Sequence, residues 1–175
     1  MEEGVLIREV SAEDIRAVTE IFNHYIENST ASFNIKPFTI GEMEERMESI
    51  YPEYPYFVAE LNGEIVGFCY AHPWKEREAY KHTWESTIYL SPSAVGKGIG
   101  ERLMRRLIQE SPLKGCRVMI ACITGGNNAS IRLHEKLGFR QVSHFRNVGY
   151  KFGNYLDVVD YQLDFPTSGQ GTGIL

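Results

Sequence analysis

The chain has 175 residues, 43% of them hydrophobic, and a formal net charge of −5. This length and composition are typical of one domain with a full core, and the negative charge argues against nucleic acid as a partner. We also expect no membrane partner, because no apolar run approaches the roughly 20 residues that cross a bilayer and the Met-Glu-Glu start is no signal peptide.

Periodicity predicts the elements in chain order. Apolar residues recur at every second position in expected strands and at helical spacing in expected helices. The predicted elements are a strand at 5–10, helices at 11–27 and 40–50, strands at 56–60, 65–71 and 81–90, a helix from 99, a strand at 116–123, a helix at 129–137 and strands at 139–150 and 155–165. These elements predict an α/β fold, in which a mixed, mostly antiparallel sheet contains one central parallel crossover.

No repeat or linker divides this order, so we expect a single domain over residues 1–165. Residues 166–175 have the composition of a disordered tail. Cys69, Cys116 and Cys122 are odd in number and lie in apolar, strand-like runs. They indicate reduced core thiols in a cytoplasmic protein.

A glycine cluster at 96–100 stands between a predicted strand and an amphipathic helix. Such a loop leaves backbone N–H groups open at the positive end of the helix, which favours a bound pyrophosphate. The spacing does not fit a P-loop, because Gly98 follows Lys97, and it does not fit the G-x-G-x-x-G of a dinucleotide fold. Residues 95–100 resemble the x-x-G-x-G loop of the GNAT N-acetyltransferases, although an ordinary turn at a helix start gives the same pattern.

The resemblance to the GNAT family extends over residues 7–165, and four further strings narrow it. They are FNHYIENST at 22–30, PWKER at 73–77, ESTIY at 85–89 and RLHEKLG at 132–138. In this order they resemble the phosphinothricin acetyltransferase branch, whose members also acetylate methionine sulfone, methionine sulfoximine and some ordinary amino acids. The resemblance implies a GNAT fold, acetyl-CoA as co-substrate without a metal, and a homodimer.

The phosphate loop departs from this family in two places. The family usually has Gln or Arg where Val95 stands, and often a larger residue at Gly96. A side-chain donor near the pyrophosphate is thereby lost, so we expect an effect on acetyl-CoA affinity more than on activity.

The expected cofactor contacts are Ile88, Tyr89, Leu90, Val95, Gly96, Lys97, Gly98, Ile99, Gly100, Asn127 and His134. For Asn127, capping of the following helix is an equally good explanation. Lys97, Arg102 and Arg106 are close enough to the loop to meet CoA phosphates, and solvated helix charges are the alternative.

Acetylation of an α-amine needs a base, because the amine is mostly protonated at neutral pH. Glu85 is the candidate base, acting through a water, and burial would raise its pKa toward neutrality; a buried acid paired with an arginine is the alternative. His134 stands where many GNAT enzymes carry a tyrosine, so it is either the group that stabilises the leaving thiolate or a packing residue. A backbone N–H near Tyr89–Leu90 is the candidate oxyanion donor.

The expected substrate contacts are Phe33, Trp74, Lys75, Arg77, Glu85, Ser86 and Thr87. Arg77 is the predicted anchor for a carboxylate, phosphinate or sulfone, because a guanidinium donates hydrogen bonds in pairs. Phe33, Trp74 and Tyr80 either form the pocket walls or belong to the core, and the loop around Arg77 is either a binding loop or a solvated connector.

Two other functions stay open. One is a GNAT enzyme that acts on a polyamine or a peptide N-terminus, although the cations Lys75, Arg77 and Lys81 argue against polyamines. The other is a non-catalytic acyl-CoA-binding sensor, which would keep the glycine loop without needing Glu85.

Overall fold

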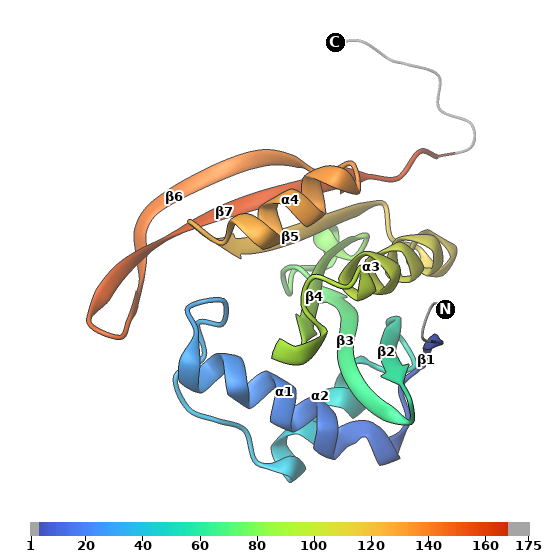
Figure 1. Ribbon diagram of the computed structural model, residues 1–175. Helices are drawn as coiled ribbons and strands as arrows, with labels where there is room; N and C mark the ends of the chain where they lie inside the picture. The colour runs from blue at the N-terminus through green and yellow to red at the C-terminus, as the bar shows by residue number, and fades with distance from the viewer. Residues whose placement is uncertain (1–3, 168–175) are drawn as a thin grey trace.

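The computed structural model describes residues 4–167, which form a seven-stranded sheet with helices on both faces (Figure 1). The strand order across the sheet is β1-β2-β3-β4-β5-β7-β6. The strands are β1 (Val5–Glu9), β2 (Tyr56–Leu61), β3 (Glu64–Pro73), β4 (Thr83–Leu90), β5 (Val118–Thr124), β6 (Arg140–Lys151) and β7 (Asn154–Asp164). The helices are α1 (Ile15–Asn28), α2 (Ile40–Ile50), α3 (Ile99–Glu110) and α4 (Asn128–Lys136).

The predicted fold class is confirmed. Among the described residues, β4 and β5 pair in parallel and all other neighbouring strands pair antiparallel. Predicted and observed bounds differ by at most two residues, except that α1 begins at Ile15 after a separate 3₁₀ turn over Ala12–Asp14. From residue 168 onward the predicted tail lies outside the described residues, and the domain boundary at residue 165 stays a prediction.

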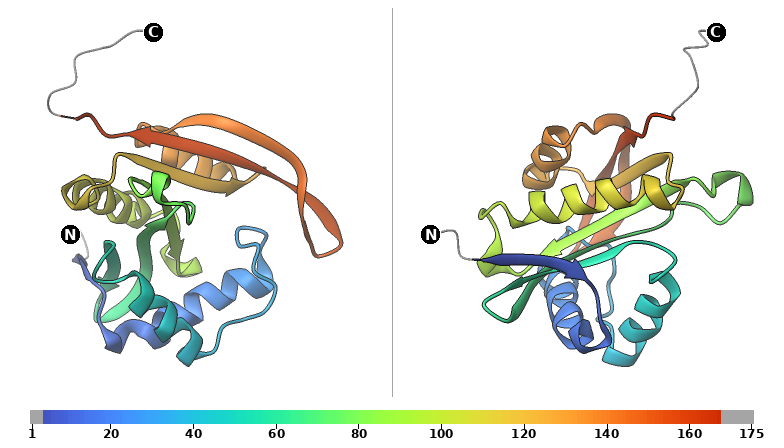
Figure 2. Two further views of the ribbon diagram at one scale, coloured as in Figure 1. Left: turned by 180° about the vertical axis from the view of Figure 1, so that it is seen from behind. Right: turned by 90° about the vertical axis from the view of Figure 1, so that its right-hand side faces the viewer.

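Two hydrophobic cores lie on opposite faces of the sheet. Side chains alternate along a strand, so Phe57 of β2 packs in the core that contains Leu103 of α3, while its neighbour Val58 packs with Val18 of α1 and Met43 of α2. Figure 2 shows α1 and α2 on one side of the sheet and α3 and α4 on the other.

Helix α2 begins at a capping box. The Thr39 Oγ1 accepts from the Glu42 N–H at 3.1 Å, and the Glu42 carboxylate accepts from the Thr39 N–H at 2.8 Å, which satisfies two of the free N–H groups of the first turn. Met43, Met47 and Ile50 are buried against the sheet. This fixes the rotation of α2 and thereby the direction of every other side chain on it.

The parallel pairing of β4 with β5 is short. It joins Thr83–Glu85 to Val118–Ile120, whereas the pairing of β4 with β3 continues to Leu90. The two central strands therefore diverge after Glu85, and the second half of β4 has no strand neighbour on that side within residues 4–167.

The cysteine prediction is confirmed in part. All three cysteines are free, and Cys69 and Cys116 are buried. The prediction of a core position was wrong for Cys122, which is exposed, because its side chain faces the gap where the central strands diverge. Within residues 4–167, no helix combines the length and the apolar character needed to cross a membrane.

Candidate active site

The divergence of β4 and β5 opens a cleft of about 930 Å³. Residues 85–90 of β4 line one side, and residues 121–127 at the end of β5 line another. The connection 29–34, α4 and the side chain of Arg46 line it further, together with Phe22 and Tyr25 of α1, Val95 and Val158 of β7.

This cleft brings together most of the predicted site residues. Those that line it are Phe33, Glu85, Ser86, Thr87, Ile88, Tyr89, Leu90, Val95, Asn127 and His134. The glycine loop 96–100 continues the chain directly from Val95. Trp74, Lys75 and Arg77 do not line the cleft.

The glycine loop has a backbone conformation that glycine adopts most readily. Gly96 and Gly98 have φ angles of 80° and 74°, and a Cβ built on either would meet no atom within 4 Å. The dihedral angle, not crowding, therefore requires glycine at both positions. The Arg102 N–H donates to the Gly98 carbonyl at 3.2 Å, so the N–H groups of the first helical turn have no helical acceptor. They suit an anionic ligand.

Two of the three cations near this loop form bonds within the chain. Arg102 donates to the Val5 carbonyl at 2.7 Å, and Arg106 forms an ion pair with Glu110 at 3.1 Å. For these two residues a structural role is favoured over the predicted phosphate contact, because a phosphate would have to displace the existing partner.

Glu85 lies half-buried in the cleft. Burial raises the pKa of its carboxyl group, and the negative charge of Asp160 on β7 adds to that effect. The Cys122 thiol and the charge of Arg46 oppose the rise in pKa. A carboxyl group with a raised pKa suits a general base near neutral pH.

A second carboxylate, Asp160, lies behind the cleft. Its Oδ2 accepts from the Ser143 hydroxyl at 2.9 Å, while its Oδ1 is buried without a hydrogen-bond partner in the described part of the chain. Although Cys122 is exposed to the cleft, the surrounding protein atoms partly desolvate its thiol, and this desolvation, with the charges of Glu85 and Asp160, raises the pKa of the thiol. A raised pKa favours the protonated thiol, which disfavours a nucleophilic role for Cys122.

His134 and Asn127 both have structural partners on α4. The Asn127 Oδ1 accepts from the Ser130 N–H at 3.3 Å, which caps the helix. The buried His134 has its Nδ1 at 2.7 Å from the Ser130 carbonyl oxygen, so this nitrogen carries the proton. Burial lowers the pKa of His134, which favours the neutral ring and leaves Nε2 as an acceptor. The geometry thus favours packing over the predicted stabilisation of the thiolate.

The connection 29–34 is fixed by side chains from other elements, a role that sequence reasoning missed. The Lys151 Nζ donates to two of its carbonyl groups and the Thr124 hydroxyl to a third, each at 2.7 Å. A Cβ on Gly149 would overlap the Phe33 ring, so this ring packs directly on the backbone of β6. Strand β6 thereby positions one wall of the cleft.

Sequence reasoning also missed Arg46 of α2. Its Nη2 donates to the Tyr70 hydroxyl at 3.0 Å, and its side chain lines the cleft. Helical spacing was the available signal, because Arg46 lies three residues after Met43 and four before Ile50, on the apolar face.

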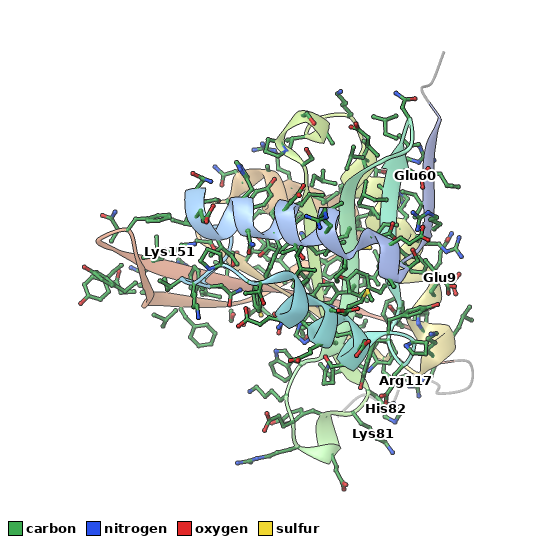
Figure 3. All side chains as sticks on the ribbon, turned by 90° about the horizontal axis from the view of Figure 1, so that it is seen from below. Glu9, Glu60, Lys81, His82, Arg117 and Lys151 are labelled. Atoms are coloured by element: carbon green, nitrogen blue, oxygen red, sulfur yellow. The ribbon has the colours of Figure 1, made fainter. Side chains whose placement is uncertain are left out.

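The loop 74–80 lies outside the cleft. Arg77 is exposed, and the Lys75 Nζ lies 4.2 and 5.5 Å from the centroids of the loop's own two aromatic rings. Figure 3 shows Lys81, at the end of this loop, well apart from Lys151, which contacts the connection 29–34. Within one chain, the structure does not bring Arg77 to Glu85.

The acetyltransferase (GNAT) family model matches residues 18–139. The chain belongs to the GNAT acetyltransferase family. This confirms the expected fold family and the enzyme class, an acyltransferase.

Two relatives and one solved structure resemble this GNAT enzyme along most of its length. It is 41% identical to the phosphinothricin N-acetyltransferase of Streptomyces viridochromogenes, over 92% of this chain and 88% of the relative. It is 36% identical to the L-methionine sulfoximine/L-methionine sulfone acetyltransferase of Salmonella typhimurium, over 90% and 92%. The crystal structure of a phosphinothricin acetyltransferase from Sinorhizobium meliloti in complex with AcCoA has a TM-score of 0.89 at 36% identity, over 94% of each chain.

Proposed function

We propose that this enzyme transfers an acetyl group from acetyl-CoA to the α-amine of a free amino acid of the phosphinothricin, methionine sulfone and methionine sulfoximine type. The observation that carries this proposal is Glu85, a half-buried carboxylate with a raised pKa in a cleft whose lining includes Val95, the residue before the glycine loop. The names of the relatives support the substrate class. Three free cysteines suit a cytoplasmic enzyme.

The residues around the cleft fit acetyl-CoA. The gap beside residues 86–90 offers an unpaired strand edge, and the loop 96–100 offers N–H groups with open space in front of Gly96 and Gly98. A pyrophosphate suits such a loop at a helix N-terminus. When bound, acetyl-CoA supplies an activated acetyl thioester.

Glu85 takes a proton from the substrate's ammonium group, directly or through a water, so that the free amine becomes a nucleophile. We assign to a backbone N–H near Tyr89–Leu90, on the strand that borders the gap, the stabilisation of the negative charge that develops during transfer. His134 packs as a neutral ring in the last turn of α4.

A thiol-release assay with the purified enzyme tests this function. We expect turnover with methionine sulfone, methionine sulfoximine and phosphinothricin, and much weaker turnover with a polyamine or a peptide N-terminus. Acetyl-CoA binding without turnover of any amine would instead identify an acyl-CoA sensor, and preferred turnover of a polyamine or peptide would identify a different GNAT enzyme.

We further infer that the enzyme is a homodimer and that Trp74, Lys75 and Arg77 reach the substrate of the partner subunit. The β6–β7 hairpin exposes a group of large apolar side chains, as expected of an interface. They are Phe145, Val148, Tyr150, Phe152 and Tyr155. An exposed loop that lies outside its own cleft can contribute to a site across such an interface.

Mixing two inactive variants tests this arrangement. Glu85→Gln and Arg77→Ala subunits, combined as heterodimers, would restore one intact site if Arg77 acts across the interface. We expect activity to return on mixing, up to about a quarter of the wild-type value for random pairing. No recovery in a dimer of confirmed size would show that Arg77 does not act across the interface, and sedimentation of a monomer would contradict the homodimer.

A further inference from the structure

Arg46 is held rigidly in the cleft. Its guanidinium carbon lies 5.9 Å from the centroid of the Phe38 ring and 5.8 Å from that of Tyr70, and its Nε and Nη2 both donate to the Tyr70 hydroxyl, at 3.3 and 3.0 Å. A guanidinium has five N–H donors. Two hydrogen bonds to a single hydroxyl leave three donors for another acceptor.

Arg46 forms no salt bridge with a carboxylate of the described residues, although its charge acts on Glu85 from a greater distance. None of the salt bridges formed by residues 4–167 includes it, and among the described residues that line the cleft it is the one lysine or arginine. A half-buried cation without an anion in direct contact is costly. A ligand that carries an anionic group would compensate this cost.

Strand register relates Arg46 to Glu85. Tyr70, which anchors Arg46, pairs with Thr87, and Thr87 is the next residue after Glu85 on the same face of β4. The strand position that holds Arg46, at Thr87, is thus two residues along the strand from Glu85, or about 7 Å. That separation suits an amino-acid head with a hydrogen bond at each end.

We propose that Arg46 binds the α-carboxylate of the substrate while Glu85 receives its α-ammonium, so that the two side chains together recognise the zwitterionic head of a free amino acid. This inference rests on the proposed function and deepens it. A peptide N-terminus carries an amide where the free amino acid has its carboxylate, and a polyamine carries no acid at all. Neither satisfies Arg46, and both leave its charge unpaired in the cleft.

The test compares L-methionine sulfone with its α-carboxamide as substrates. kcat/KM is measured for both with the wild type, Arg46→Met and Arg46→Lys. We expect Arg46→Met to lower kcat/KM for the acid about 10- to 100-fold, the range of a charge-assisted hydrogen bond, and to leave that for the carboxamide nearly unchanged. Arg46→Lys keeps the charge but not the paired donors, so its kcat/KM for the acid should lie between those of the wild type and Arg46→Met. The lower basicity of the carboxamide's amine cancels, because each comparison is made between variants.

Controls separate this binding role from packing. Arg16→Met changes an exposed arginine of α1 and should leave kcat/KM for both compounds unchanged. The acetyl-CoA-dependent rise in Tm should persist in both Arg46 variants. An equal loss for acid and carboxamide in the Arg46 variants would show a structural role and overturn the inference. If Arg46→Met does not fold, the acid-to-carboxamide ratio of Arg46→Lys decides the same question.

A selective loss for the acid in Arg77→Met, with none in the Arg46 variants, would move the carboxylate contact to Arg77 and also overturn the inference. The proposed function has a separate test in the wild type. A wild-type enzyme that acetylates the acid while the Arg46 variants keep the wild-type ratio refutes the role of Arg46 alone. A wild type that acetylates neither compound refutes the proposed function and, with it, this substrate class.

Discussion

At the scale of single residues, Glu85 shows how one environment affects both chemistry and stability. Its pKa is raised mainly by burial, so the folded protein holds this proton more tightly than the unfolded chain does. Below the pKa that Glu85 has in the unfolded chain, the carboxyl group is protonated in both states and costs no stability. As pH rises from that value to the higher pKa of Glu85 in the folded protein, the free energy of unfolding falls.

Replacement of Glu85 by Gln should lower kcat about 10²- to 10⁴-fold, the usual contribution of a general base. The acidic limb of the profile of kcat/KM against pH should disappear, and that limb should lie above the ordinary carboxyl range in the wild type. Steady-state kinetics across pH measure both. Retention of most activity at neutral pH would show that another group takes the proton.

The same substitution should raise Tm at neutral pH, because it removes a charge that the cleft disfavours. At a pH well below the ordinary carboxyl range, where Glu85 is protonated in both states, the difference between variant and wild type should vanish. Thermal unfolding at several pH values measures this. Glu20→Gln, at an exposed position on α1, serves as the control, and an equal rise in Tm there would contradict the explanation by burial.

At the scale of elements, the glycine loop and the connection 29–34 are positioned in different ways. The loop depends on its own dihedral angles, so its sequence pattern was sufficient to predict it. The connection depends on donors from β5 and β6 that are about 90 to 120 residues away in sequence. No local pattern encodes such contacts, and sequence reasoning could therefore not assign Lys151 to the site.

Gly98→Val should abolish the rise in Tm that acetyl-CoA causes, since bound ligand stabilises only the native state. The variant should still fold, because a side chain there meets open space, with a strain of roughly 1–2 kcal/mol from the positive φ. Circular dichroism and thermal unfolding with and without acetyl-CoA measure both effects. An undiminished shift in a folded variant would contradict the cofactor assignment.

Lys151→Met should loosen the connection 29–34 and raise KM for the amino acid, while the acetyl-CoA-dependent shift in Tm persists. Two carbonyl groups lose their donor, so the free energy of unfolding should fall by about 1–3 kcal/mol. Lys114→Met is a matched control, since the exposed Lys114 also donates to a carbonyl, that of Pro52, at 2.7 Å. An equal effect on KM in both variants would contradict the role of Lys151 in the cleft.

At the scale of the whole molecule, the sequence predicted the sheet and its crossover because strand alternation and helical spacing are local signals. The roles of Glu85 and of the cofactor residues come from strings that resemble the family, and they stay predictions. Arg46 and Arg77 mark the limit of this reasoning. Both are arginines near acidic residues, and only the rotation of α2 and the direction of the loop 74–80 decide that the first faces the cleft and the second faces solvent.

The short pairing between β4 and β5 divides the sheet into two parts, β1–β4 and β5–β7, joined at their centre by three residue pairs. A bound ligand that lies along residues 86–90 would act as a removable strand and connect the two parts. Without ligand, the amide protons of β4 that face the gap should exchange with deuterium within the fastest class of the sheet, whereas those that bond β3 stay protected. With acetyl-CoA, protection should appear along β4 and spread to β5, as measured by hydrogen exchange and mass spectrometry. Substrate supply would then set how firmly the two halves of this enzyme are held together.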